Sequence, residues 1–404
     1  MGADAAPLPL GRIGVLGAGT MGAGIAQLAA EAGIEVAVHD PVAGAYERAL
    51  ERTAGFLARK VEKGQLSDPS RAAALARIVP AADVEALGAA DLVIEAIPED
   101  LDLKRDAFRR LDAAARAATI LASNTSSLSI GAIAEATSRP DRVVGMHFFN
   151  PVPLMALVEV IAGSRTDPKV AEATMAAARR LGKTPVLAAD TPGFIVNRVA
   201  RPFYLEAMQI AGEGSATIEA IDAAARGIGF RMGPFELVDT IGADVNLAVS
   251  ESVYEAFGRD PRYQPHDMQR ALVEAGRLGR KAGAGFYEYS PDGARGGAWA
   301  SLPVRAGQPL TDAHLAQRLL ATIVNEAVSA VADEVAAPEA IDTAMRLGAN
   351  YPSGPLEWGE RIGLNQVVRT LDALAAASPD GRYRVVPLLR SLAESGGSFF
   401  ALRP

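Results

Sequence analysis

Two residues twelve positions apart, His147 and Glu159, have the side chains needed to move a proton at neutral pH. His147 follows the apolar run Val143–Met146, and Glu159 lies in another apolar run, Leu157–Val160. An imidazole held by a carboxylate keeps one tautomer and accepts a proton more readily, as the oxidation of an alcohol requires. The alternative for His147 alone is a buried ring bonded to backbone, because spacing by itself does not bring the two side chains together.

A hydroxyl-rich segment, Ser123–Ser127, follows the predicted strand Thr119–Leu121. Strands of an open α/β sheet present ligand-binding groups at their carboxyl ends, so these hydroxyls and the amide of Asn124 could bind a substrate oxygen there. Such residues are also common in loops that cap helices, and that alternative stays open.

The most informative local pattern is the run Gly17-Ala18-Gly19-Thr20-Met21-Gly22, which lies between an apolar strand and an apolar helix. Glycines at these three places allow a tight turn, approach of the backbone to a pyrophosphate, and close packing of helix on sheet. A second strand, Val36–Val38, leads to Asp40, about twenty residues downstream, where a carboxylate would bind the ribose hydroxyls. The pattern predicts a dinucleotide site, and an acid at position 40 favours NAD over NADP.

The composition is that of a globular protein without a membrane span. Of 404 residues, 49% are hydrophobic and 22% charged, and no apolar run reaches the roughly 18 residues that a bilayer requires. The net charge of -8 argues against nucleic acid as a general partner. There is no cysteine, so thiol catalysis and disulfides are excluded, and we predict no metal site. With no secretory pattern in Met1–Pro7, these features favour a cytoplasmic enzyme.

The alternation of short Val/Ile/Leu runs with Ala-rich stretches over the first 190 residues predicts a parallel sheet covered on both faces. Residues 42–79 are expected to form a long helical excursion within it. We therefore assign residues 11–190 to a Rossmann-type α/β domain that binds NAD. Further strands are predicted at Leu92–Ile94, Val143–Met146, Leu157–Val160 and Thr184–Leu187.

At Asp190-Thr191-Pro192 the pattern changes, and helical periodicity dominates to the C-terminus. This part contains an internal duplication: Ile218–Asp222 matches Pro338–Asp342, and Gly233-Pro234 matches Gly354-Pro355. The expected organisation is a helical domain at 191–290, a Gly/Pro-rich linker at 291–310 and a second, degenerate copy at 311–404. The fold class is thus an α/β domain followed by two related all-α domains.

Several longer motifs together resemble the L-3-hydroxyacyl-CoA dehydrogenase family. They are GAGTMG, EAIPEDLDLK at 95–104, SNTSSLSI at 123–130, HFFNPVPLMALVEV at 147–160, DTPGFIVNR at 190–198 and GRKAGAGFYEY at 279–289. The resemblance covers about residues 11–289. It is close to the members of the family that act on 3-hydroxybutyryl-CoA. The duplicated tail is similar to a second C-terminal domain, as in longer members of the family.

The resemblance implies a role for each matching residue. His147 would remove the proton of the 3-hydroxyl group, Glu159 would orient it, and Ser126 and Asn197 would bind the substrate oxygens. Residues Gly17, Gly19, Thr20, Met21, Gly22 and Asp40 would hold the adenosine and pyrophosphate of NAD, and Glu99, Lys104, Asn150 and Lys281 would lie near its nicotinamide half. Lys63, with Lys60, would contact the phosphates of CoA, although a serine common in the family is replaced by Phe56.

The second helical copy lacks the asparagine of the first, because Gln317-Arg318 matches Asn197-Arg198. We therefore predict one active site per chain. As a hypothesis, the second copy packs on the first around a pseudo-twofold axis, in place of the contact that single-copy relatives make between subunits. The chain would then be a monomer with an internal pseudo-dimer, or a homodimer.

The function expected from these motifs is the reversible, NAD-dependent oxidation of short-chain (S)-3-hydroxyacyl-CoA to 3-oxoacyl-CoA, as in fatty acid β-oxidation. Two alternatives remain open. One is a dehydrogenase of a free 3-hydroxy acid or sugar acid, which would not depend on Lys63. The other is a non-catalytic NAD-binding protein, in which decay of the chemical positions would be expected, whereas His147, Glu159, Ser126 and Asn197 are all present.

Overall fold

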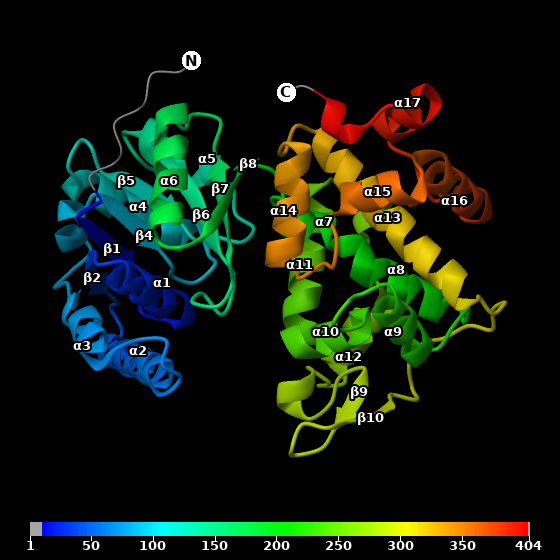
Figure 1. The fold of residues 1–404 in the computed structure, drawn as a ribbon, viewed down its shortest axis with the longest axis horizontal. Helices are drawn as coiled ribbons and strands as arrows, with labels where there is room; N and C mark the ends of the chain where they lie inside the picture. Colours follow the sequence, from blue (N-terminus) through cyan, green and yellow to red (C-terminus); the bar gives the residue numbers. More distant parts are fainter. Residues whose placement is uncertain (1–9, 403–404) are drawn as a thin grey trace. The chain divides into compact units, whose positions relative to one another are not determined.

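The computed structural model describes residues 10–402, and the chain divides after Phe194 into two compact units (Figure 1). The segment Met1–Pro7, on which the expected lack of a secretory signal rests, lies outside the described residues. Among the helices of residues 10–402, none combines the length and the apolar character needed to cross a membrane.

The first unit is built on an eight-stranded sheet of order β3-β2-β1-β4-β5-β6-β7-β8. The order from β3 to β6 is that of a dinucleotide-binding fold, in which the strand order reverses beside β1. The predicted Rossmann-type domain is therefore confirmed. The strands are β1 Arg12–Leu16, β2 Glu35–His39, β3 Ile78–Pro80, β4 Leu92–Glu95, β5 Ile120–Ser123, β6 Val143–Phe148, β7 Leu157–Ala162 and β8 Thr184–Ala189.

The direction of the last two strands differs from the expectation of a wholly parallel sheet. Strands β1 to β6 pair in parallel, but β6 and β7 are antiparallel, and β8 follows β7 in parallel. The physical reason is the short connection: only residues 149–156 separate β6 from β7, and a parallel pair needs a crossover of a dozen residues or more.

A further difference concerns the helical excursion expected at residues 42–79. Its two helices are present, but the segment ends in strand β3, whose Val79 pairs with Ala37 of β2. A three-residue strand that closes the sheet edge carries too little periodicity to be separated from the preceding helix. The helices of this unit are α1 Thr20–Glu31, α2 Ala45–Glu62, α3 Asp68–Ala76, α4 Leu101–Ala114, α5 Ile130–Ala134 and α6 Pro168–Arg180, with short 3-10 segments at Glu85–Ala89 and Pro140–Arg142.

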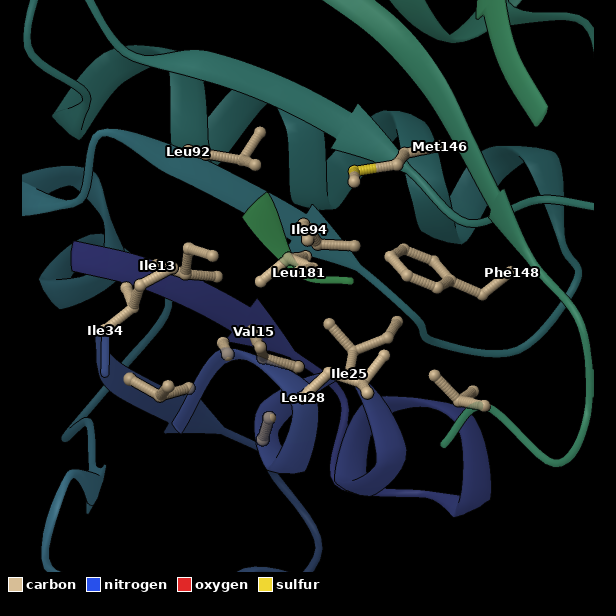
Figure 2. Close-up of a cluster of buried hydrophobic side chains, with 14 of the residues drawn as sticks. Ile13, Val15, Ile25, Leu28, Ile34, Leu92, Ile94, Met146, Phe148 and Leu181 are labelled. Atoms are coloured by element: carbon tan, nitrogen blue, oxygen red, sulfur yellow. The ribbon is translucent and has the colours of Figure 1, made fainter. Parts of the chain in front are cut away.

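One face of the sheet forms the main core with α1 and α6. Alternate residues of each strand point to this face, and Ile25 and Leu28 of α1 lie beside Val15 of β1 (Figure 2). The intervening residues, such as Val93 and Leu121, are also buried and face the side that carries α4 and α5. With both faces covered, the open carboxyl edge of the sheet is where ligands can reach polar groups.

The second unit is helical apart from one small hairpin. Part of the segment expected to be a linker, Arg295–Ala298, forms strand β10 and pairs with β9, Tyr287–Tyr289. The helices are α7 Val196–Val199, α8 Arg201–Gly212, α9 Ile218–Gly227, α10 Pro234–Ile241, α11 Ala243–Ala256, α12 Asp267–Glu274, α13 Asp312–Ala332, α14 Pro338–Gly348, α15 Pro355–Ile362, α16 Leu364–Ala377 and α17 Pro387–Ser395, with 3-10 segments at Pro261–Tyr263, Arg280–Ala282 and Phe399–Ala401.

Two buried aspartates 120 positions apart hold equivalent helix starts in this unit. The carboxylate of Asp222 accepts hydrogen bonds from the backbone N–H groups of Phe235 and Glu236 at the start of α10. That of Asp342 does the same for Leu356 and Glu357 at the start of α15. Each satisfies N–H groups that a helix leaves without an internal partner.

Buried arginines join the segment 196–298 to the segment 312–401. Arg198 of α7 pairs with Glu326 of α13, and Arg318 of α13 pairs with Glu206 of α8. Glu326 also accepts a hydrogen bond from the hydroxyl of Tyr263, and Glu206 accepts one from the hydroxyl of Tyr383. Helices α8 and α13 pack directly against each other in the same region.

Candidate active site

The ladder between β6 and β7 brings His147 and Glu159 together. These residues are register partners, so their side chains leave the same face of the sheet as a cross-strand pair. Nδ1 of His147 lies 2.7 Å from Oε2 of Glu159, and the two side chains are 8% and 0% exposed. Because an ionised carboxylate can only accept, Nδ1 carries the proton, and Nε2 is left with a lone pair.

Two aromatic rings surround the imidazole and fix its plane. The ring centre of Phe149 lies 4.5 Å from that of His147, and the ring centre of Phe194 lies 6.0 Å away. The end of β6 is held as well, since the N–H of Phe148 donates to Oδ1 of Asn124 at 2.8 Å. Asn124 thus positions the strand that carries His147, a contact across the sheet that the sequence does not reveal.

The hydroxyl-rich segment after β5 is gathered around a single carboxylate oxygen. Oε1 of Glu99 accepts from the hydroxyl of Thr125 at 2.7 Å, from the N–H groups of Ser126 and Ser127, and from both of their hydroxyls. The Ser126 hydroxyl makes the longest of these contacts, at 3.2 Å. Although burial opposes it, the Thr125 hydrogen bond and the charge of Lys104 lower the pKa of Glu99, so the carboxylate is ionised.

Lys104 lies beneath this carboxylate rather than at the surface. Its side chain is 1% exposed, and its ammonium nitrogen lies 2.6 Å from Oε1 of Glu95 and 3.4 Å from Oε2 of Glu99. Oε2 of Glu95 accepts a hydrogen bond from the Ser123 hydroxyl, with 2.6 Å between the two oxygens. A buried, paired lysine of this kind positions Glu99, which is itself partly exposed.

The glycine-rich turn has the shape of a phosphate cradle. Gly17 has φ +100°, and a Cβ on it would lie 2.6 Å from the carbonyl oxygen of Ala96. A Cβ on Gly22 would collide with the carbonyl of Gly17, whereas one on Gly19 would meet no atom within 4 Å. Gly17 and Gly22 therefore serve packing, and Gly19, with the exposed Thr20 beside it, opens the N-terminus of α1 to a ligand.

Asp40 closes the same turn from the end of β2. Its Oδ2 accepts the N–H of Ala18 at 2.7 Å, and its Oδ1 accepts that of Val42 at 2.9 Å. Arg52 of α2 donates to the carbonyl oxygen of Ala18 at 2.8 Å. A carboxylate has further lone pairs, so Asp40 can still accept hydrogen bonds from two ribose hydroxyls.

The remaining residues implied by the sequence lie in varied surroundings. Asn150 is exposed in the loop after β6, and Met21 is half-buried in α1. Lys60 forms an ion pair with Glu31, while Lys63 follows the end of α2 and is exposed. Two of the residues belong to the second unit: the half-buried Asn197 in α7 and the exposed Lys281 in the 3-10 segment Arg280–Ala282.

Comparison with known proteins identifies the family. The model of the NAD-binding domain of 3-hydroxyacyl-CoA dehydrogenase matches residues 12–191, and the model of the C-terminal domain of the same enzymes matches residues 193–289 and 314–398. The chain belongs to the 3-hydroxyacyl-CoA dehydrogenase family. It is therefore an NAD-binding oxidoreductase.

Relatives of two kinds are similar to the chain. Over 95% of this chain and 98% of the relative, it is 39% identical to 3-hydroxyadipyl-CoA dehydrogenase of Escherichia coli K12. It is 46% identical to a probable 3-hydroxybutyryl-CoA dehydrogenase of Bacillus subtilis, over 69% of this chain and 97% of the relative. A crystal structure of 3-hydroxybutyryl-CoA dehydrogenase from Escherichia coli K12 superposes with a TM-score of 0.89 at 38% identity, covering 96% of this chain and all of that one.

Proposed function

We propose that the chain oxidises short-chain (S)-3-hydroxyacyl-CoA to 3-oxoacyl-CoA reversibly, with His147 as the general base. The observation that carries this proposal is the 2.7 Å contact of His147 with the fully buried Glu159. Among the relatives, the names include both 3-hydroxybutyryl-CoA and 3-hydroxyadipyl-CoA dehydrogenases, so acyl chains of four to six carbons are the substrate range we infer.

The protein must first remove the proton of the substrate hydroxyl group. Nε2 of His147 accepts it as the C3–O bond becomes a carbonyl, and the imidazolium that forms is stabilised by the Glu159 carboxylate. Bound NAD supplies the acceptor for the hydride that leaves C3. In the reverse direction the imidazolium returns its proton to the carbonyl oxygen.

Donors that bind the substrate oxygens are the second requirement. Five groups share one oxygen of Glu99, and the Ser126 hydroxyl makes the longest of these contacts. Because its hydrogen bond is the weakest of the five, this hydroxyl gives up the least interaction energy when it turns to donate to a substrate oxygen. Asn197 is proposed as a second such donor, through its amide group. Aimed donors of this kind stabilise charge that develops on oxygen in the transition state.

We also assign residues to the two halves of NAD. The turn formed by Gly17, Gly19, Thr20, Met21 and Gly22 is proposed to bind the pyrophosphate, with Gly19 and Thr20 facing it and with Gly17 and Gly22 allowing the close packing of the turn. We assign Glu99, Lys104, Asn150 and Lys281 to the nicotinamide half, where Lys104 acts through Glu99 because it is buried.

For the phosphates of CoA, Lys63 is the stronger candidate because Lys60 is already paired with Glu31. Phe56, 37% exposed with Arg59 over its ring at 4.7 Å, replaces the serine expected there. We infer that CoA meets an aromatic surface at this position instead of a hydroxyl group.

The domain organisation is also a proposal. We propose that residues 191–290 and 311–404 are related helical domains that pack as an internal pseudo-dimer. The reciprocal pairs Arg198–Glu326 and Arg318–Glu206 support it, because a twofold arrangement makes residue i contact j′ while j contacts i′. The lack of cysteine supports the cytoplasmic location expected for such an enzyme.

The decisive experiment is NADH consumption with acetoacetyl-CoA by the purified chain and by His147→Gln. The variant should lose about 10²- to 10⁴-fold in turnover, because a positioned general base is missing. Binding of NADH, followed by fluorescence, should persist. Turnover by the variant close to that of the wild type would remove His147 from the mechanism.

Cofactor choice is tested at Asp40. Asp40→Ala should weaken NAD binding and narrow the preference for NAD over NADP, because the carboxylate that accepts the ribose hydroxyls also repels a 2′-phosphate. The measurement is kcat/KM for both cofactors. An unchanged ratio would contradict the ribose role, and thermal unfolding controls for the lost hydrogen bond to Ala18.

A further inference from the structure

Three arginine side chains are buried in the described residues, all of them in the second unit: Arg198, Arg201 and Arg318. Arg198 pairs with Glu326 and Asp333, and Arg318 pairs with Glu206 and Glu213. Arg201 differs from both. It is 5% exposed, yet no carboxylate of the described second unit lies within 4 Å of its guanidinium.

The contacts of Arg201 are with neutral groups. Its Nε donates to the carbonyl oxygen of Asn197 at 2.9 Å, and one terminal nitrogen reaches Ser250 at 3.2 Å and the carbonyl oxygen of Asn246 at 3.5 Å. The ring of Tyr204 lies 5.0 Å from the guanidinium carbon. These groups leave the positive charge without a counter-ion, and a buried unpaired charge is costly unless something compensates it.

Two further polar atoms around this arginine have no partner in the described residues. They are the hydroxyl of Tyr351 and the side-chain nitrogen of Asn246, both fully buried. Tyr351 lies close enough for Arg201 to act on the pKa of its hydroxyl, although burial dominates and raises that pKa. Tyr351 is held in place by Phe230, whose ring centre is 4.9 Å away. A cation and two unused hydrogen-bond donors are the groups that an anion with several oxygens requires.

We propose that Arg201 binds the terminal carboxylate of a 3-hydroxyacyl-CoA whose acyl chain ends in an acid, with Tyr351 and Asn246 as additional donors. The proposal rests on the proposed function and narrows its substrate class. A carboxylate supplies the missing counter-charge and matches the planar guanidinium with two oxygens. It also accepts the hydrogen bonds that Tyr351 and Asn246 leave unmade.

The position of Arg201 relative to Asn197 suits this substrate. Asn197 lies in α7 and Arg201 begins α8, and the Nε of Arg201 lies 2.9 Å from the carbonyl oxygen of Asn197, so the two residues are close neighbours. Asn197 is the proposed donor to a substrate oxygen near C3. Three carbon–carbon bonds of about 1.5 Å each, from C3 to C6 of an extended chain, span about 4 Å, so a six-carbon dicarboxylic chain suits two binding groups on neighbouring residues.

The test compares two substrates that differ only at the chain end. The full-length wild-type chain is assayed with NAD and 3-hydroxyadipyl-CoA, which ends in a carboxylate, or 3-hydroxyhexanoyl-CoA, which ends in a methyl group. Both carry the same CoA phosphates, so the ratio of their kcat/KM values isolates the terminal carboxylate. We expect the ratio to favour the acid about 10- to 100-fold. A ratio near one, or one that favours the methyl group, would overturn the proposal.

Arg201→Met should remove this preference, and Arg201→Lys should restore part of it because the charge returns without the planar fork. Arg259→Met is the matched control, since Arg259 is 68% exposed and paired with Glu255. Its ratio should equal that of the wild type. A loss at Arg201 that is equal for both substrates would mean a structural role only and would contradict the proposal.

Tyr351→Phe decides the case if the Arg201 variants do not fold, because the hydroxyl it removes has no partner to lose. The ratio should fall at least threefold in this variant, and an unchanged ratio would count against the proposal. Reduction of acetoacetyl-CoA by the wild type serves as the separate check on the proposed function. If that reaction proceeds while neither six-carbon substrate is preferred, only the carboxylate inference fails.

Discussion

The segments 193–289 and 314–398 of the helical unit both match the family model of the C-terminal domain and share several buried contacts, but they differ in the residues proposed to act on a substrate. Asp222 and Asp342 hold equivalent helix starts, and Arg198 and Arg318 each reach across to the other segment. In contrast, the residue that the sequence matches to Asn197 is Gln317, whose amide donates a hydrogen bond to Thr370. The comparison teaches that residues needed for folding occur in both segments, while those proposed for chemistry occur in one.

The C-terminal ends of the two segments share a buried phenylalanine that is held by an acid, but they differ in secondary structure. Asp239 accepts hydrogen bonds from the N–H groups of Phe286 and Tyr287 and thereby fixes the β9 hairpin. Glu360 accepts the N–H of Phe399, which is fully buried but is followed by a 3-10 turn instead of a strand. The second segment therefore keeps the buried phenylalanine that completes its core and lacks the hairpin with β10.

The largest effect is expected from breaking the contacts between the segments. Glu326→Gln removes the buried carboxylate that neutralises Arg198 and Arg262 and should cost about 3–5 kcal/mol of stability. Glu206→Gln should cost less, because Arg318 keeps Glu213 through two nitrogens, whereas Arg198 keeps only the half-exposed Asp333 through one. Urea unfolding followed by circular dichroism measures both. Glu255→Gln, in an exposed pair, is the control. Small and equal losses in both variants would show that the segments do not depend on these contacts.

The next effect concerns chemistry in one segment only. Asn197→Ala should lower kcat with acetoacetyl-CoA about 10²- to 10³-fold, the usual cost of losing one donor to a developing oxyanion. Gln317→Ala, at the matching position, should leave turnover unchanged. Steady-state kinetics of the two variants at saturating NADH makes the comparison. Equal losses would mean that the second segment also contributes to a reactive site.

The smallest effect distinguishes the two buried aspartates. Asp222 accepts a third hydrogen bond, from the Tyr287 hydroxyl at 2.7 Å, for which Asp342 has no counterpart in the described residues. Asp222→Asn should therefore cost about 2 kcal/mol and Asp342→Asn about 1 kcal/mol, since an amide nitrogen cannot accept. Unfolding midpoints in urea measure the difference. The reverse order would contradict the role given to Tyr287.

These aspartates should also give different pH profiles. Burial raises the pKa of Asp222 to about 7 and that of Asp342 to about 6, so the folded chain retains protons that the unfolded chain releases above about pH 4. The stability from this protonation is fully present below that pH and is lost as the pH rises through each raised pKa. The wild type should exceed Asp222→Asn in free energy of unfolding by an amount that decreases as the pH rises to about 7. For Asp342→Asn, the same difference should decrease only up to about pH 6. A constant advantage from pH 4 to 7 would contradict the raised pKa values.

Much of the nucleotide-binding unit could be predicted because its signals are local. The glycine spacing, the apolar runs and the acid after β2 are properties of neighbouring residues, and the structure has strands at all seven predicted places. Strand β3 was missed, because three residues carry almost no periodicity. The residue types of the candidate site could be predicted from the sequence. The five hydrogen bonds to Oε1 of Glu99 could not, because they depend on how the chain segments after β4 and β5 pack together.

The sequence alone determined that this chain contains a dinucleotide cradle, an imidazole and a carboxylate twelve residues apart, and a repeated helical pattern. Only the tertiary structure decided that β7 turns back antiparallel beside β6, which makes His147 and Glu159 register partners. It alone decided which buried arginines meet carboxylates and that Arg201 does not. The physical reason is that turns and periodicity arise from adjacent residues, whereas the neutralisation of a buried charge depends on groups far apart in the chain.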